Sequence, residues 1–281
     1  MNSGTLYRRA AFTDNPKGGN PAGVWVGETL PPVDVMQRIA SEIGYSETAF
    51  VAPTIGKTRT IRYYSPEMEV PFCGHATIAT GVVLGETEGD GTYRLATAVG
   101  EVSITVHSQG GVREASLTSV EPSYTGASDV LVNEALSALG WQASDVDGSI
   151  PPVRAYAGAW HLVLAINDPH RLTKLNYDFE RLKALMLREG LTTLQLVWRE
   201  STNVFHSRNP FQVGGVVEDP ATGAAAAALG GYLRESELIA VPSTIFIRQG
   251  EAMGRPSRLT VEIPATGGIV VRGTAVPIEA D

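Results

Sequence analysis

One stretch near the end of the chain decides the fold: Val217-Glu218-Asp219-Pro220-Ala221-Thr222-Gly223, followed by small residues from Ala224 to Ala228. It predicts an acidic pair on a tight turn that opens a helix, with Asp219 as the candidate N-cap and Pro220 in the first helical position. The first N–H groups of a helix lack partners inside it and carry the positive end of its dipole. The stretch therefore predicts an anion site with a carboxylate beside it.

An earlier stretch repeats this plan: Phe72-Cys73-Gly74-His75-Ala76-Thr77. It predicts a turn at Gly74-His75 and a helix over Ala76 to Leu84 that is apolar on every side, which is typical of a helix buried on all sides. In both halves of the chain a strand, a polar loop with Ser and Pro, a tight turn and the pair Ala-Thr precede the small-residue helix. This repetition indicates two related halves.

The whole pattern, with about a dozen expected strands and four or five helices, predicts the α+β class. We expect two pseudo-symmetric halves, each a curved mixed or antiparallel sheet wrapped around a central buried helix. The N-terminal half is expected over residues 1–120, with a returning strand at 268–281, and the C-terminal half over 121–267, after a linker at Glu121 to Gly126. A pseudo-twofold axis would bring the two helix starts to one interdomain cleft, where small-molecule sites concentrate.

Composition excludes several classes of protein. The 281 residues include 30 acidic and 22 basic ones, for a net charge of −8, and no Lys/Arg run, so neither nucleic acid nor an anionic membrane is an expected partner. No apolar run is long enough to span a bilayer and the N-terminus lacks the features of a signal peptide, which predicts a cytoplasmic protein. The single cysteine, Cys73, excludes an internal disulfide and a multi-thiolate zinc site.

Three side chains are candidates for chemistry. Glu47 follows Gly44-Tyr45-Ser46 and opens an apolar strand, so its carboxylate is either a partly desolvated proton carrier or a solvated strand-end group. His75 lies in the first turn of a buried helix, where the helix dipole favours a neutral imidazole that exchanges one proton, unless it is a capping or core histidine. Asp219 either caps its helix or also orients a ligand hydroxyl or amine, with Glu218 as a second carboxylate.

Other site types are not indicated. The remaining histidines, His107, His161, His170 and His206, show no metal-ligand spacing and are expected to be ordinary strand and loop residues, so we predict no metal. Neither a Walker A motif nor a Gly-x-Gly-x-x-Gly turn occurs. The segment around Ser46 runs from helix to strand, which argues against a serine hydrolase.

Four motifs occur together and in order along the chain: Gly19-Asn20-Pro21-Ala22, Ser46-Glu47-Thr48-Ala49-Phe50-Val51, Arg62 to Thr77 with Ser65-Pro66 and Phe72-Cys73-Gly74-His75, and Glu218-Asp219-Pro220-Ala221-Thr222-Gly223. Together they resemble the phenazine-biosynthesis PhzF-like isomerases. The resemblance implies a diaminopimelate epimerase-like fold, no cofactor and a homodimer. It also implies an isomerase that shifts a proton on a small carboxylate-bearing metabolite.

The resemblance also assigns roles to residues. It implies that Glu47 takes and returns the proton as general base and acid, and that His75 and Asp219 assist by hydrogen bonding to the substrate. The substrate-binding positions that it implies are Asn20, Gly74, Ala76, Thr77, Thr222 and Gly223. In the phenazine enzyme the substrate is dihydro-3-hydroxyanthranilate.

One departure concerns the substrate. The family commonly has a serine after Thr-Gly, where this chain has Ala224, so an unknown small acid is the expected substrate. The single thiol excludes the two-cysteine mechanism of epimerases with the same fold. Two alternatives stay open: a lyase or hydro-lyase that uses the same base, and a non-catalytic protein that binds small acids.

Overall fold

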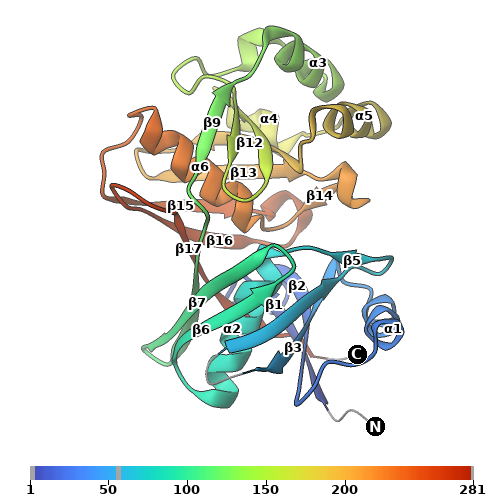
Figure 1. Cartoon of the computed structure of the whole chain (residues 1–281). Helices are drawn as coiled ribbons and strands as arrows, with labels where there is room; N and C mark the ends of the chain where they lie inside the picture. The colour runs from blue at the N-terminus through green and yellow to red at the C-terminus, as the bar shows by residue number, and fades with distance from the viewer. Residues whose placement is uncertain (1–3, 55–57, 280–281) are drawn as a thin grey trace. The chain divides into compact units, whose positions relative to one another are not determined.

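The computed structural model describes residues 4–54 and 58–279, so both ends of the predicted N-terminal half, at 1–3 and 280–281, lie outside the described residues. The chain divides into two compact units, Met1–Thr118 with Arg272–Asp281 and Ser119–Val271. Each unit contains a mixed sheet and one buried helix (Figure 1). The predicted α+β class, with a sheet around a central helix in each half, is confirmed.

The first unit contains most of the N-terminal elements and receives the last strand of the chain. Their bounds are β1 Gly4–Ala11, β2 Asn20–Gly27, α1 Val33–Ile43, β3 Glu47–Pro53, β4 Thr58–Tyr64, β5 Glu69–Val70, α2 Gly74–Glu88, β6 Gly91–Thr97, β7 Gly100–Gln109, β8 Val112–Thr118 and β17 Val270–Pro277.

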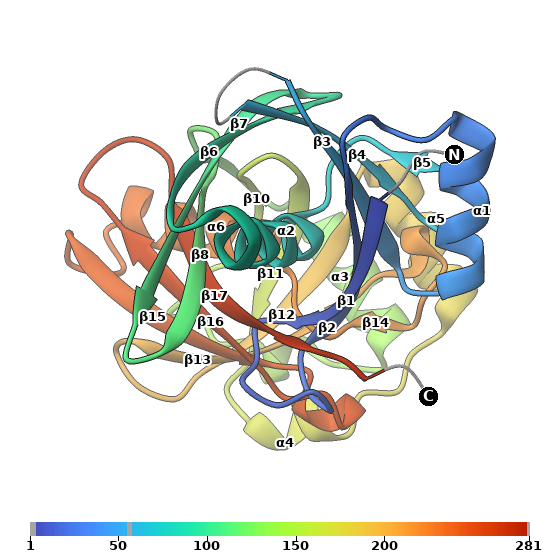
Figure 2. The same ribbon diagram turned by 90° about the horizontal axis from the view of Figure 1, so that it is seen from below.

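The strands of the first unit form a closed ring. Hydrogen-bonded neighbours follow the order β1, β2, β3, β4, β6, β7, β8 and β17, and β17 pairs again with β1. Figure 2 looks along α2 and shows it inside this ring. Residues His75 to Gly85 of α2 are all buried, as the apolar sequence of the helix predicts.

Small residues let α2 approach the sheet closely. A Cβ added to Gly81 would lie 2.5 Å from Ile104 Cδ1 on β7 and 2.9 Å from Ala115 Cβ on β8.

Helix α1 lies on the outside of the ring, where Met36 and Ala40 are buried in a cluster with aromatic residues of β2 to β4. It ends at Gly44, whose left-handed conformation (φ 69°) is typical of a helix C-terminus.

The second unit repeats the plan with more helices. Its elements are β9 Ser123–Gly126, α3 Asp129–Leu139, η1 Ala143–Asp145, β10 Val153–Tyr156, β11 Trp160–Ala165, α4 Pro169–Thr173, α5 Phe179–Glu189, β12 Thr193–Arg199, β13 Val204–Pro210, η2 Gln212–Gly214, β14 Glu218–Asp219, α6 Gly223–Glu235, β15 Ser243–Gln249, η3 Glu251–Met253 and β16 Ser257–Ile263.

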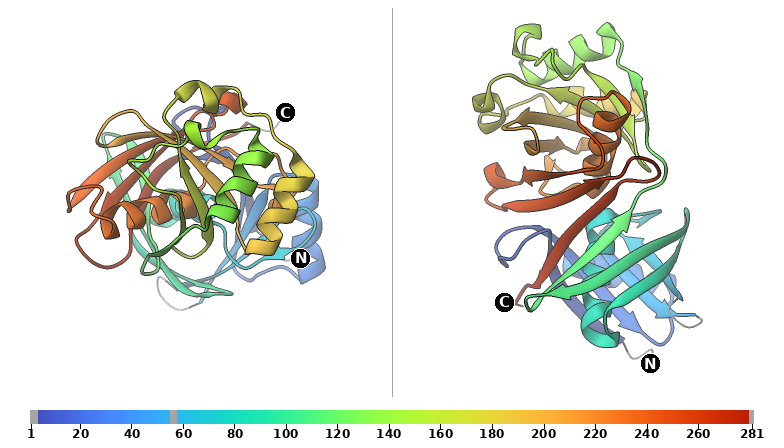
Figure 3. Two further views of the ribbon diagram at one scale, coloured as in Figure 1. Left: turned by 90° about the horizontal axis from the view of Figure 1, so that it is seen from above. Right: turned by 90° about the vertical axis from the view of Figure 1, so that its left-hand side faces the viewer.

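The sheet of this unit has helices on both faces. Strands β9, β10, β11, β12, β13, β15 and β16 are neighbours in that order. Helices α3 and α5 lie next to each other (Figure 3), and their leucines share a core with β11 and β12. Helix α6 is buried from Ala225 to Arg234.

The two units repeat one order of elements, as the repeated motifs predicted. In each, two parallel strands joined through helices (β2 and β3; β11 and β12) precede an antiparallel strand, a two-residue strand and the buried helix. A parallel strand then follows that helix, because a helical crossover returns the chain in the same direction.

Three local predictions were wrong. Part of the expected linker, Ser123–Gly126, is strand β9, whose exposed side chains give no apolar alternation although its backbone pairs with β10. Helix α2 begins at Gly74, so Gly74 and His75 are helical residues rather than a turn before the helix. His170, expected in a strand or loop, lies in α4.

The described residues contain no helix long and apolar enough to cross a membrane.

Candidate functional site

Glu47 and His75 lie together in the first unit. Glu47 is the first residue of β3 and His75 is the second residue of α2. Glu47 Oε2 lies 3.5 Å from His75 Nε2, and the two side chains are only 13% and 6% exposed. The structure therefore brings the predicted proton carrier and the predicted histidine into contact at one mostly buried place.

Asn20 contacts the other edge of the same imidazole. It is the first residue of β2, is 1% exposed, and its Nδ2 lies 3.1 Å from His75 Nδ1. An amide nitrogen can only donate, so Nδ1 accepts and a neutral ring carries its proton on Nε2. That N–H faces Glu47 and also Ser46, whose Oγ lies 3.4 Å from Nε2. The family resemblance implied that Asn20 binds substrate. Its contact with His75 joins residues 55 positions apart, so no local sequence pattern could predict it.

Cys73 packs against the face of the imidazole. Its Sγ lies 3.3 Å from Nδ1 and 3.8 Å from Nε2 of His75. An atom bound along the lone pair of one ring nitrogen would be clearly farther from the other nitrogen, so the thiol lies over the ring rather than in its plane. Cys73 itself is buried and directly precedes the helix, which is a typical environment for a small core residue.

Glu47, Cys73 and His75 are a candidate metal site. Within residues 4–54 and 58–279, Glu47, Cys73 and His75 are one group with ligand atoms within 4.8 Å of one another. Carboxylate, thiolate and imidazole are zinc ligands, but a metal approaches imidazole in the ring plane. Here the thiol is off that plane and Nδ1 already accepts from Asn20. The group fits a metal poorly, and the absence of a metal stays a prediction.

Thr77 stabilises the start of α2 through the hydrogen bonds of its buried hydroxyl. Its hydroxyl donates to the carbonyl of Cys73 at 2.6 Å, and it accepts from the Tyr63 hydroxyl, also at 2.6 Å. Burial raises the pKa of Tyr63 well above its ordinary value, so this phenol stays a donor. The Thr77 hydroxyl, implied by the resemblance to bind substrate, is thus engaged with the protein, and its N–H also bonds to Cys73.

The two central helices begin without a side-chain cap, whereas the peripheral helices of the second unit have one. Neither Cys73 before α2 nor Thr222 before α6 accepts a hydrogen bond from the first turn of its helix. By contrast, Ser128, Asp168 and Asp178 cap α3, α4 and α5. The first N–H groups of α2 and of α6, which include the predicted positions Gly74, Ala76 and Gly223, therefore have no capping side chain.

Asp219 in the second unit is not an N-cap, so the predicted helix start was wrong by three residues. Asp219 belongs to β14, and α6 begins at Gly223 with Thr222 in the N-cap position. The reason is that Asp219 pairs with Asn209 on β13, which extends the backbone before the helix can form. Its carboxylate accepts a hydrogen bond from the Thr222 hydroxyl at 2.6 Å, so these two predicted site residues are brought together.

Glu218 is not a second carboxylate of the site. Its side chain is 2% exposed and pairs with Arg208, whose Nε lies 2.9 Å from Oε1. The first unit has the same arrangement, with Arg62 Nε 2.7 Å from Glu69 Oε1. In both units an arginine from the strand before the central helix holds the two-residue strand, which is a structural use of the acid.

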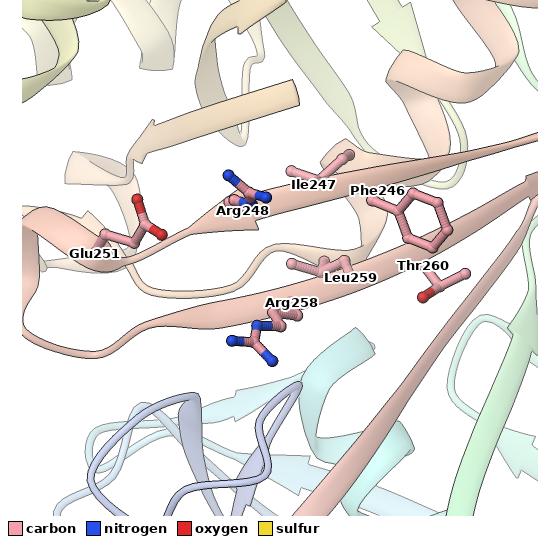
Figure 4. Close-up of a pocket in the computed structure, with 7 residues that line it drawn as sticks. All are labelled: Phe246, Ile247, Arg248, Glu251, Arg258, Leu259 and Thr260. Carbon is pink, nitrogen blue, oxygen red and sulfur yellow. The ribbon is translucent and has the colours of Figure 1, made fainter. Parts of the chain in front are cut away.

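A groove of about 410 Å³ lies on the second unit but contains none of the predicted site residues (Figure 4). Its walls come from β15 and β16, where Arg248 and Arg258 are direct cross-strand neighbours. Arg248 also bonds to Glu200 at 2.9 Å. Side chains alternate along a strand, so this groove follows the outer face of β15, while Gln249 lies on the buried face.

Known proteins resemble this chain in sequence over most of its length. The chain matches the family model described as phenazine biosynthesis-like protein over residues 9–280. It is 32% identical to trans-2,3-dihydro-3-hydroxyanthranilate isomerase of Pseudomonas fluorescens, over 95% of this chain and 97% of that protein. It is 31% identical to an uncharacterized isomerase of Deinococcus radiodurans, over 95% of this chain and 87% of that protein.

Solved structures show the same fold. A PhzF-family phenazine biosynthesis protein of Bacillus anthracis has a TM-score of 0.85 at 24% identity, covering 98% of this chain and 96% of that one. A hydroxyproline epimerase of Agrobacterium vitis has a TM-score of 0.65 at 12% identity, covering 99% of this chain and 92% of that one. The resemblance and the epimerase-like fold expected from the sequence are confirmed, and the chain belongs to the phenazine biosynthesis-like (PhzC-PhzF) family of isomerases.

Proposed function

We propose that this isomerase shifts a proton on a small carboxylate-bearing substrate without a cofactor, and that Glu47 takes the proton from one carbon and returns it to another. The observation that carries the proposal is the pairing of Glu47 with the N–H edge of His75. Within the described part of the chain no lysine or arginine pairs with Glu47, so no fixed cation competes for its lone pairs. A largely buried carboxylate that faces a neutral donor suits proton transfer in both directions.

In this proposal the histidine positions the base. Asn20 donates its amide N–H to Nδ1 and so keeps the imidazole N–H on Nε2, the side of Glu47 and Ser46. The Nε2 edge lies 3.5 Å from Oε2 of Glu47, which leaves the other carboxylate oxygen for the substrate. When Glu47 has taken a proton, the same imidazole edge stays a neutral neighbour, which allows the proton to be returned.

The helix starts supply donors for the substrate carboxylate. The first turn of α2 is uncapped, and N–H groups there, including those of Gly74 and Ala76, are preorganised donors at the positive end of a buried helix. Asp219, Thr222 and Gly223 are proposed to hold the substrate through hydrogen bonds, as the family resemblance implies. Ala224 lacks the hydroxyl common at that position, which favours a substrate other than the phenazine intermediate.

The test follows solvent deuterium. The protein is incubated in D₂O with trans-2,3-dihydro-3-hydroxyanthranilate, the compound named for the Pseudomonas fluorescens relative, and with a panel of small carboxylic acids. Mass spectrometry then detects deuterium at carbon and the mass of the product in H₂O. An isomerase leaves that mass unchanged, whereas a lyase would lower it.

Two variants complete the test. Glu47→Gln keeps the size of the side chain and removes its basicity, so kcat is expected to fall by roughly 10²- to 10⁴-fold. Glu42→Gln on α1, where the side chain is 70% exposed, is the matched control and keeps full activity. Undiminished turnover by Glu47→Gln would refute the assigned base. The proposed homodimer is tested separately by light scattering on the wild-type protein.

A further inference from the structure

Gln249 is a buried side chain whose amide forms hydrogen bonds to one turn. It is the last residue of β15 and is 2% exposed. Its Nε2 donates to the carbonyl of Asp219 at 2.7 Å and to the Thr222 hydroxyl at 3.0 Å. Its Oε1 accepts from the backbone N–H of Thr222 at 3.2 Å. One amide thus holds the turn that leads into α6 at three points.

These bonds decide the direction of the Thr222 hydroxyl. Because the hydroxyl oxygen accepts from Gln249, its own proton is directed to Asp219 Oδ2 at 2.6 Å. A threonine in the N-cap position ordinarily turns its oxygen to the first N–H groups of the helix. Thr222 makes no such cap. The Gln249 amide therefore diverts this hydroxyl from the helix to the carboxylate.

The backbone beside Gln249 fits the turn closely. Gly250 follows with φ 75°, and an added Cβ there would lie 2.7 Å from the carbonyl oxygen of Pro220 and 2.3 Å from that of Arg255. The end of β15 and the turn are therefore in direct contact. The three hydrogen bonds from Gln249 to Asp219 and Thr222, called the clamp below, are part of the packed structure of the second unit.

We propose that Gln249 is a positioning residue for the isomerase reaction. It acts through Thr222: it holds the carboxylate of Asp219 in one orientation and keeps the first N–H groups of α6 available to a carboxylate-bearing substrate. The inference rests on the proposed function for its catalytic consequence, although the clamp itself can be measured without any substrate.

The first experiment measures the clamp. Amide hydrogen exchange of the ¹⁵N-labelled protein is followed by NMR for wild type, Gln249→Met and the control Gln195→Met. Gln195 is also buried, on β12, and within the described part of the chain its side chain forms no hydrogen bond to the turn. Loss of the bond to Oε1 is expected to speed exchange of the Thr222 amide roughly five- to tenfold in Gln249→Met only. Unchanged exchange would overturn the inference, whatever the substrate is.

The second experiment tests the route through Thr222 with the substrate found in the deuterium screen. Gln249→Met and Thr222→Val are each expected to lower kcat by roughly tenfold, and the double variant by about the same factor, since both remove one shared arrangement. Thr222→Ser keeps the hydroxyl and is expected to retain most of the activity. Losses that multiply in the double variant would overturn the route.

A third variant gives a signature that a loss of folding would not produce. In Gln249→Glu the introduced carboxyl can donate a hydrogen bond only while it is protonated. Its activity relative to wild type is therefore expected to fall as the pH rises through the titration of that carboxyl. A constant ratio across the pH range would contradict the need for a donor at this position. If no acid is turned over by the wild type, the proposed function fails and the exchange experiment still decides the clamp.

Discussion

Asn20 and His75 form a pair in which the amide sets the tautomer of the imidazole. The Asn20 Nδ2 lies 3.1 Å from Nδ1 of His75, and both side chains are almost completely buried. The amide comes from the start of β2 and the imidazole from the first turn of α2, 55 residues later. This contact turns the protonated ring nitrogen to Glu47, so it links the closed sheet of the first unit to the proposed chemistry.

The tautomer of His75 is therefore expected to depend on Asn20. In Asn20→Asp the new carboxylate accepts from Nδ1, so the ring proton moves to that nitrogen or the ring takes a second proton. ¹⁵N NMR of the histidine rings distinguishes these forms, and the other four histidines serve as internal controls. We also expect kcat to fall by about tenfold, the order of one hydrogen bond. A ring that keeps its proton on Nε2 alone in this variant would contradict the assignment.

The two arginine–glutamate pairs are expected to differ in their contribution to stability. Arg208 and Glu218 have side chains 14% and 2% exposed, whereas Arg62 and Glu69 are 30% and 34% exposed. Arg208→Met leaves a buried carboxylate without its cation and is expected to lower the free energy of unfolding by ~3–5 kcal/mol. Arg62→Met, the matched change in the first unit, is expected to lower it by ~1 kcal/mol or less.

Urea unfolding followed by fluorescence measures both changes. Adding Glu218→Leu to Arg208→Met removes the unpaired charge, and we expect it to recover much of the lost stability. Equal losses for the two single arginine variants would show that burial does not decide the contribution of these pairs.

His161 is expected to make folding sensitive to mild acid. Burial lowers the pKa of His161 from 6.5 to about 3, and its Nδ1 lies 2.8 Å from the Thr193 hydroxyl. The unfolded chain therefore binds a proton more readily than the folded one between these two values. The contribution of this neutral histidine is complete above pH 6.5 and is lost as the pH falls toward 3, with about 2 kcal/mol lost by pH 5.

The His161→Gln variant isolates the contribution of His161 to the free energy of unfolding. Its free energy of unfolding is expected to vary less between pH 7 and pH 5 than that of the wild type, by the same ~2 kcal/mol. Comparing the two proteins over the pH range cancels the contribution of the carboxylates that both contain. Parallel curves would show that His161 does not contribute to acid sensitivity.

Any side chain at Gly81 is expected to lower the stability of the fold. An alanine Cβ would lie 2.5 Å from Ile104 Cδ1 and 2.9 Å from Ala115 Cβ, inside the closed ring of strands. Gly81→Ala gains about 1 kcal/mol of helix propensity, but overpacking costs typically 1–3 kcal/mol, so we expect a net loss of ~1 kcal/mol. Thermal unfolding measures it. Gly148→Ala, where an added Cβ meets nothing within 4 Å, is the control and should be close to neutral.

Several parts of the fold and site could be predicted from sequence. The apolar α2 and the Ala-rich α6 are the buried central helices. Glu47 and His75 were singled out separately and lie in contact. Each of these features depends on residues close together in the chain, where periodicity reports burial directly.

The errors have a common cause. Asp219 was expected to cap a helix and Glu218 to add a second acid, but pairing of β14 with β13 and the ion pair to Arg208 gave both residues other partners. Strand β9 was expected to be a linker because its exposed residues show no alternation. In each case the deciding partner belongs to another strand, and the local sequence contains no signal for its register.

The sequence by itself determined which helices are buried and which family motifs are present, because composition and short-range spacing decide burial and turn chemistry. Only the tertiary structure decided that Asn20 faces His75, that β17 closes the first ring, and that Gln249 holds the turn before α6. These contacts join residues 27 to 55 positions apart, or strands from the two ends of the chain. Strand register brings such residues together, and it is a property of the assembled sheet rather than of any single segment.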